Sequence, residues 1–260
     1  MNKLEVAKEA IASNETLNDS LKHNIMELVT IFNKNFEQVS LDNFNERIKT
    51  LRIKRGSSYL QNTDSVYRPL ENALYLNEKM LMKVDAKHSL MMTILQIITA
   101  KKSYYGMNNN GKLKGLNIGF TEMIANNLVG NEEEIKNYDE LVMVNLAVEI
   151  AGVENTLNAY FSNKSEIFTK PFINNSNNME RATSLLDEIE YNYIARNKIN
   201  KSHLGENIEV FLNIHANESN IEKINQNIVF YPEHENIDYS SLNRVKNALK
   251  ETKQEEMKTI

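Results

Sequence analysis

Apolar residues recur at helical spacing along most of the chain, and this pattern predicts its main elements. Within residues 2–38, the apolar side chains that share one helical face are Leu21, Ile25, Leu28, Val29, Phe32 and Phe36. The same spacing predicts later helices over residues 85–102, 119–130, 138–152, 153–161 and 179–199, and a polar terminal helix over 240–260. Asp85 is suited to cap the first of these later helices, and Gly130 and Gly152 are suited to end two others.

Two short segments alternate between apolar and polar residues, as half-buried strands do. In "IKTLRIKRG", Leu51 and Ile53 fall on one side of the segment, and Arg52 and Lys54 fall on the other. A second short strand is predicted around residues 73–76. The basic side chains suit either a ligand patch or a solvated strand face, and the solvated face is the commoner arrangement. The whole pattern predicts an α+β fold that is predominantly α-helical, with a small sheet of two to four strands packed on helices.

Composition narrows the function classes. The chain has 260 residues, a formal net charge of −5 and no cysteine. The negative charge gives no reason to expect nucleic acid or an anionic membrane as partner. Without cysteine there is no disulfide framework, no Cys-based zinc site and no thiol nucleophile. The N-terminal residues are polar and acidic, and no long apolar run follows, so we expect a cytoplasmic protein without signal peptide or membrane span. Abundant Asn, Lys and Ile are typical of low-GC bacteria.

Most familiar catalytic motifs are absent from the sequence. It contains no Gly-rich phosphate loop, no GxSxG elbow and no dinucleotide-binding fingerprint. The acidic run "NEEEIKNYDE" lacks the alternating oxygen ligands and the glycine of a calcium loop, so a solvated helix start explains it better. The five histidines show no ligand spacing, and His203, His215 and His234 are predicted to lie at the surface because their neighbours are polar. We therefore expect no cofactor.

Two segments together suggest a degenerate metallopeptidase: "MTILQIIT", Met92–Thr99, and "LNIGFTE", Leu116–Glu122. A zinc peptidase places two His four residues apart on one helix face, with a Glu directly after the first His. That Glu acts on the metal-bound water, and a Glu on a second helix is the third ligand. The order of strands, motif helix, loop and second helix resembles small bacterial zincin-like metallopeptidases of the HExxH…NEGxTE type.

The resemblance implies a site that has lost its chemistry. Met92 stands at the first His and Thr93 at the general-base Glu. Gln96 stands at the second His and Ile118 at the third ligand. Around them, Asn117, Gly119, Thr121 and Glu122 keep the family pattern, and Glu122 matches an acid that orients a ligand His. Because none of the four replacements is a good zinc ligand or base, no metal is expected.

A second register places the broken motif at "HSLMM", His88 to Met92. It keeps one His and still loses the base and the second His, so the expected loss of catalysis is the same in both registers. His88 shares a helix face with Met92 and Gln96. A different explanation is that the segment is an ordinary core helix of an unrelated helical domain.

The Asn-rich stretch "PFINNSNNME" is the best candidate for a linker. We therefore expect an N-terminal helical extension over residues 1–20, a zincin-like domain over 21–173 and a C-terminal helical region over 174–260, which is either separate or part of the same domain. The leading functional expectation is a catalytically inactive binding or regulatory module that accepts a peptide or protein in the vestigial cleft. The alternatives are a hydrolase that uses other residues, such as Glu122 with His88, and a structural or prophage-type interaction protein. The oligomeric state is left open.

Overall fold

The structure is a computed structural model that describes residues 2–56, 65–77, 87–108, 111–130, 137–199 and 203–215. The chain forms two compact units. Unit 1 consists of Met1–Gly111, Thr121–Asn137 and Asn158–Ser165, and unit 2 consists of Lys112–Phe120, Tyr138–Leu157 and Glu166–Ile260. Two helices, α6 (Lys114–Val129) and α8 (Val153–Ser162), contribute residues to both units. The predicted division of the chain at residues 20 and 173 remains a prediction.

Unit 1 begins with the helices α1 (Lys3–Ala12), α2 (Asp19–Asn35) and α3 (Asp42–Lys49), followed by three strands and α5 (Lys87–Ile98). The side chains of Asn2 and Asn18 accept hydrogen bonds from the first turns of α1 and α2, as helix caps do. The expected amphipathic region over 2–38 is therefore two capped helices, and α3 was not predicted. The predicted cap at Asp85 lies outside the described residues.

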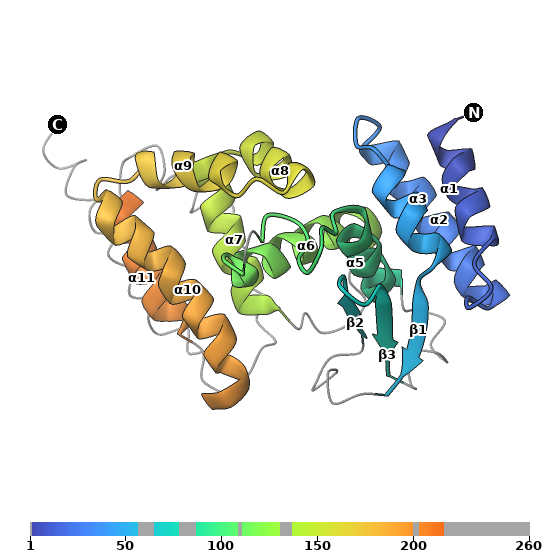
Figure 1. The fold of residues 1–260 in the computed structure, drawn as a ribbon. Coiled ribbons are helices and arrows are strands. Elements are labelled where there is room, and N and C mark those ends of the chain that lie inside the picture. Colours follow the sequence, from blue (N-terminus) through green and yellow to red (C-terminus); the bar gives the residue numbers. More distant parts are fainter. Residues whose placement is uncertain are drawn as a thin grey trace, which may run out of the picture. The chain divides into compact units, whose positions relative to one another are not determined.

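The sheet of unit 1 has the strand order β1 (Arg52–Arg55), β3 (Ala73–Leu76), β2 (Ser65–Arg68). β1 pairs with β3 in parallel, whereas β2 pairs with β3 in the antiparallel sense. Figure 1 shows β1 below α3, and β3 and β2 below α5. The two predicted strands are confirmed, and the three-stranded mixed sheet on a mostly helical protein confirms the predicted fold class. β2 was missed because four residues of mixed character give no clear alternation.

Helix α5 is the core of unit 1. It packs against α2, α3 and β2, and apolar residues cover most of its circumference. Seven of its side chains are buried: Leu90, Met91, Thr93, Ile94, Leu95, Ile97 and Ile98. A helix that is apolar nearly all round is stable only when neighbours cover it on several sides.

Asparagine side chains bind the last carbonyl groups of α5. The Asn43 amide donates to the carbonyl oxygens of Ile97, Ile98 and Ala100 at 2.9 to 3.0 Å. The Asn163 amide donates to the carbonyls of Thr99 and Gly106 at 2.8 Å. The last carbonyls of a helix have no partner within the helix, so these amides satisfy groups that would otherwise be buried unbonded. Part of the abundant asparagine is thus structural.

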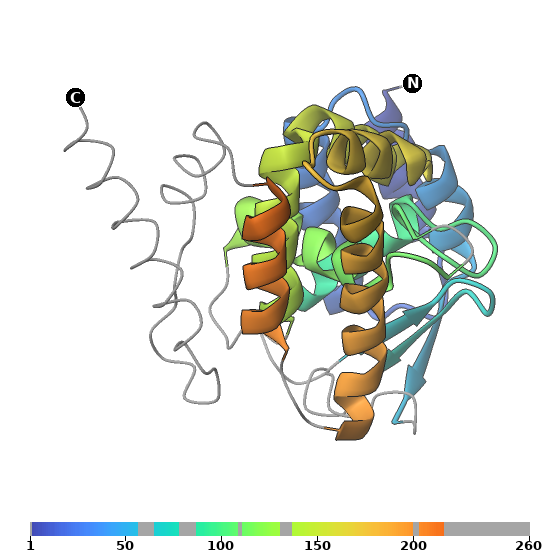
Figure 2. The same cartoon turned by 90° about the vertical axis from the view of Figure 1, so that its left-hand side faces the viewer.

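Unit 2 is built of helices. It contains α7 (Tyr138–Ala151), α9 (Glu166–Asn174), α10 (Met179–Ile199) and α11 (Leu204–His215), together with parts of α6 and α8. α9 packs against α7 and α10, and α11 packs against α7 and α10. Figure 2 shows α10 and α11 side by side. None of the helices in the described ranges is both long enough and apolar enough to cross a bilayer.

The predicted helices of this part are confirmed, with one correction. α7 and α8 occupy the predicted places, and α10 matches residues 179–199. The linker prediction was wrong in its first half, because Pro171–Asn174 belongs to α9, whose Phe168 and Phe172 are fully buried. Helix α11 was not predicted. The predicted terminal helix over 240–260 lies outside the described residues.

Two glycines allow the N-terminal half of α6 to pack closely within unit 2. A Cβ atom at Gly115 would lie 3.1 Å from Cβ of Tyr193 on α10. A Cβ atom at Gly119 would lie 2.2 Å from the carbonyl oxygen of Glu140 on α7. Glu190 on α10 accepts a 3.1 Å hydrogen bond from the backbone N–H of Gly115, which binds the first turn of α6. Burial raises the pKa of Glu190, although backbone N–H groups of α6 oppose the shift.

Candidate functional site

The face of α5 that contains His88, Met92 and Gln96 was the predicted site. These residues follow at intervals of four and therefore lie above one another on the helix. All three side chains are half-buried. Thr93 is buried instead, and its hydroxyl donates to the carbonyl oxygen of Ser89 at 3.0 Å, within its own helix. A hydroxyl bonded in this way is not available as a base.

The main polar contact of this face joins His88 to Glu122 on α6. His88 Nε2 lies 3.1 Å from Glu122 Oε1, and the side chains are 18% and 3% exposed. The Asn137 amide donates to the other carboxylate oxygen, Oε2, at 3.0 Å. The His88 Nε2 atom is fully buried, and the angle of its approach to the carboxylate does not meet hydrogen-bond geometry. The contact is therefore close and electrostatic rather than a well-directed hydrogen bond. The sequence had placed His88 on this face, whereas nothing in the sequence pointed to Asn137.

Gln96, at the C-terminal end of this face, makes a weaker contact. Gln96 Nε2 donates to the hydroxyl of Tyr105 at 3.4 Å, a long hydrogen bond. Nearby in unit 1, the hydroxyls of Thr121 and Tyr160 are 2.9 Å apart, and both residues are fully buried. Burial raises the pKa of Tyr160, so this phenol stays protonated. Thr121, a family position in the resemblance, therefore has a packing role of its own.

Ile118 lies in a different environment from the other predicted site residues. It is buried in the part of α6 that belongs to unit 2, one turn before Glu122. Met92, Thr93 and Gln96 belong to unit 1. The structure thus brings together His88 and Glu122, and the expected convergence of Met92 and Gln96 on Ile118 stays a prediction.

The residues of this face do not fit a zinc ion. Zinc in proteins is bound by three or four His, Cys, Asp or Glu side chains. Within the described ranges, no group of three or more such residues is placed to bind a metal. His88 and Glu122 supply two candidate ligands, and the thioether of Met92 is a poor third.

His215 is a correction to the sequence analysis, because it is 1% exposed rather than at the surface. Its Nδ1 faces the carbonyl oxygen of Phe211 at 3.1 Å, and its Nε2 faces that of Phe172 at 3.3 Å. The rings of both phenylalanines pack on the imidazole. The polar neighbours in sequence hid this burial, since α11 itself was not predicted. His203 is 37% exposed and contacts Glu206, and His234 lies outside the described residues.

We expect unit 2 to lose stability on acidification through His215. Burial lowers the pKa of this imidazole below its ordinary value of 6.5. The unfolded chain therefore binds the proton more readily than the folded chain, and the stabilisation present above pH 6.5 is lost as the pH falls through the lowered pKa. Urea unfolding of the wild type and of His215→Gln at a series of pH values measures this loss. Equal pH dependence in the two proteins contradicts it.

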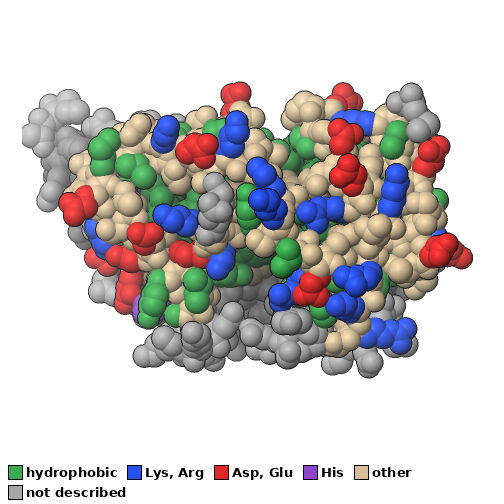
Figure 3. Space-filling model, viewed as in Figure 1, with side chains coloured by type: hydrophobic (Ala, Val, Ile, Leu, Met, Phe, Trp, Pro, Cys, Tyr) green, Lys and Arg blue, Asp and Glu red, His purple; other side chains and the backbone are tan. Residues whose placement is uncertain are grey.

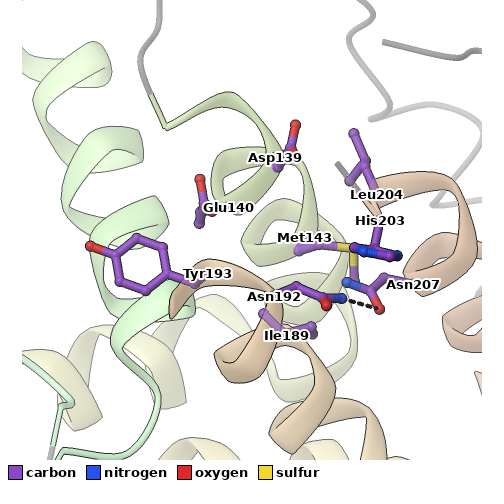
Figure 4. Close-up of a pocket in the computed structure, with 9 residues that line it drawn as sticks. All are labelled: Asp139, Glu140, Met143, Ile189, Asn192, Tyr193, His203, Leu204 and Asn207. Atoms are coloured by element: carbon purple, nitrogen blue, oxygen red, sulfur yellow. Dashed lines mark hydrogen bonds between the residues drawn. The ribbon is translucent and has the colours of Figure 1, made fainter. Parts of the chain in front are cut away.

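A small pocket opens in unit 2 between α7, α10 and α11. Figure 4 shows nine side chains on its wall, including the amides of Asn192 and Asn207, which are 3.5 Å apart. Two acids, Asp139 and Glu140, also line it. They lie in the first turn of α7, where negative charge stabilises a helix. These acids have a structural explanation, and no sequence motif pointed to this pocket.

Comparison of the chain with protein-family models, curated proteins and solved structures finds no match.

Proposed function

We propose that this chain is a zincin-like protein without metal-dependent catalysis, and that it acts by binding a partner. The observation that supports the proposal most directly is the contact of His88 with Glu122. In the second register of the resemblance, His88 stands at the first ligand position of the motif helix. Glu122 then supplies a carboxylate from the second helix, in place of Ile118, which stands at the third ligand of the family layout. Ser89 stands at the base position and Met92 at the second His.

The distance between the two side chains is consistent with this origin. Two ligand atoms of a tetrahedral zinc ion, each about 2.0 to 2.1 Å from the metal, lie roughly 3.3 Å apart. His88 Nε2 and Glu122 Oε1 are 3.1 Å apart, and the poor angle between them is unusual for a contact selected as a hydrogen bond. In this proposal, the direct contact joins α5 to α6 where a metal once joined them. The buried carboxylate is also bound by Asn137, so it does not need a metal to offset its burial.

The same replacements remove hydrolysis. Ser89 is not a general base at neutral pH, and the hydroxyl of Thr93, the base position of the first register, is bonded within α5. What remains is the half-buried row of Met92 and Gln96, whose thioether and amide offer apolar contact and hydrogen bonding. A peptide or protein segment is the partner that such a face suits.

We expect protein purified without an affinity tag to contain well below one zinc per chain, because two ligands do not hold the ion against water. Elemental analysis measures this directly. Roughly one zinc per chain contradicts the proposal.

Thr93→Ala is expected to lower stability modestly and to change no hydrolytic rate. If the protein has a peptidase activity and this substitution abolishes it, the proposal is contradicted.

A hydrolase that uses His88 and Glu122 is the second candidate, and their contact favours it. A carboxylate beside an imidazole can orient the ring, as in many general-base pairs. Within the described ranges, the side chain that hydrogen-bonds this pair is that of Asn137, whose amide is not a nucleophile. Assays on ester and peptide substrates with His88→Gln as control separate the two functions. Activity that this variant loses while it stays folded supports the hydrolase.

A further inference from the structure

The β1 strand forms an open edge of the sheet in unit 1. Among the described residues, it pairs only with β3. The backbone N–H groups of Arg52 and Gly56 donate to β3-side carbonyls at 3.1 and 3.2 Å. Because successive residues of a strand direct their N–H groups to opposite sides, those of Ile53 and Arg55 face the open edge. This edge can accept another extended strand.

Basic side chains concentrate on and around this edge. Residues 47–56 contain no acid and five basic residues: Arg47, Lys49, Arg52, Lys54 and Arg55. Arg52 and Arg55 are exposed. Figure 3 shows Lys and Arg side chains gathered over the strands, with few acidic ones among them. This local excess contrasts with the net charge of −5 of the whole chain.

One acid organises three of the cations on a single face of the sheet. Glu71 binds Lys54 at 3.0 Å and Arg68 at 2.7 Å through its carboxylate. Its backbone carbonyl accepts from Arg52 at 2.7 Å. Lys54 also donates to the hydroxyl of Tyr75 and lies over its ring. Three positive charges and one negative charge leave this face with a local charge of about +2 that is fixed in place.

Charged side chains at an edge strand also protect against self-association. That role requires only that charges be present at the edge. It does not require Lys54 and Arg68 to be held around Glu71, and it is served equally by acids. A preorganised face of one sign is what recognition of an oppositely charged group requires.

We propose that the β1 edge binds an extended acidic peptide segment, which adds to the sheet as a fourth strand. Main-chain hydrogen bonds to Ile53 and Arg55 supply part of the affinity. Acidic side chains at alternate positions of the added strand lie roughly 6.6 Å apart, the same spacing as Arg52 and Lys54 along β1. The site is separate from the His88 face and does not depend on the proposed function.

An acidic peptide fits this surface better than a nucleic acid does. Single-stranded nucleic acids bind sheets through exposed aromatic rings on which bases stack. The two tyrosines of this sheet, Tyr67 and Tyr75, are 4% and 6% exposed, so neither presents a ring face. The negative total charge of the protein also disfavours a long polyanion, whereas a short segment experiences mainly the local field.

Fluorescence anisotropy with a labelled peptide of about ten residues, alternating Glu and Val, tests the proposal on the full chain. Arg52→Glu with Lys54→Glu is expected to weaken binding by about tenfold or more. Lys34→Glu with Lys164→Glu makes the same charge change at exposed positions elsewhere in unit 1 and is expected to change it by less than about twofold. Circular dichroism checks that each variant is folded.

A second probe separates strand addition from simple charge attraction, and it needs no variant. The same peptide, N-methylated at alternate residues, keeps its carboxylates and cannot pair along one edge. We expect it to bind at least about tenfold more weakly than the unmodified peptide. Equal binding of the two peptides, or tighter binding of an oligonucleotide of similar charge, overturns the proposal. So does failure of the unmodified peptide to bind the wild type.

Discussion

Replacement of Gly119 by alanine is expected to destabilise unit 2 by on the order of 3 kcal/mol, because overpacking against main chain leaves no flexible group to yield. The added Cβ would lie 2.2 Å from the carbonyl oxygen of Glu140, 2.5 Å from its carbonyl carbon and 3.0 Å from the backbone nitrogen of Leu141. The first turn of α7 must then move away from α6. The gain in helix propensity from glycine to alanine, about 1 kcal/mol, is too small to compensate.

Gly115→Ala is the matched control, since it lies one turn earlier in the same helix. Its Cβ would lie 3.1 Å from a side-chain atom of Tyr193 and 3.4 Å from the carbonyl oxygen of Ile189, which small shifts can relieve. We expect the control to stay within about 1 kcal/mol of the wild type. Urea unfolding followed by circular dichroism measures both variants. Equal stability of the two shows that α6 and α7 do not approach as closely as the structure indicates.

The close approach of α6 to α7 at Gly119 gives a structural explanation for part of the segment that resembles the zincin-like family. Gly119 and Thr121 both belong to the "LNIGFTE" segment that suggested the family. Packing explains the glycine, and the hydrogen bond with Tyr160 explains the threonine. Neither residue therefore distinguishes a degenerate zincin from an unrelated helical protein. Glu122 distinguishes the two better than these residues do. Burying a carboxylate beside His88 costs free energy, and packing alone does not require a carboxylate at this position.

The sequence predicted those elements whose signal is local. α10 has a long amphipathic pattern, and α7 ends at Ala151, directly before Gly152, which adopts the left-handed backbone conformation with φ +90°. Elements that depend on distant partners were missed. β2 has only four residues, and it is a strand because its backbone pairs with that of β3. α9 contains Pro171 and a run of asparagine follows it, both of which suggested a linker, yet two buried phenylalanines stabilise it.

The candidate site was predicted in part for the same reason. Periodicity alone places His88, Met92 and Gln96 on one face of α5. The pairing of His88 with Glu122 joins residues far apart in the chain, and sequence spacing cannot decide which turn of α6 meets which turn of α5. The register of the motif was open for this reason. In the proposed function, the contact of His88 with Glu122 corresponds to the register that begins at His88.

A zinc site is expected to form when only two residues are changed, Ser89→Glu and Met92→His. In the second register these changes restore the complete motif, with His88 and the new histidine four residues apart on one face of α5. Glu122 lies 3.1 Å from His88, so we expect it to act as the third ligand in place of Ile118. Two histidines and one carboxylate with an open fourth position form the ligand set of a catalytic zinc ion. We expect one zinc per chain with a Kd of about 1 µM or lower.

Calorimetry on three variants decides between the registers. Adding Glu122→Gln to the double variant removes one ligand and is expected to abolish tight binding. The first register instead requires Met92→His, Thr93→Glu, Gln96→His and Ile118→Glu. This quadruple variant is expected to bind more weakly and to be less stable, since Ile118 and Thr93 are buried and two new carboxylates must be desolvated. Tight zinc binding by the quadruple variant alone shows that the motif begins at Met92. Absence of zinc affinity in a folded double variant shows that His88 and Glu122 are an ordinary buried pair of a helical core.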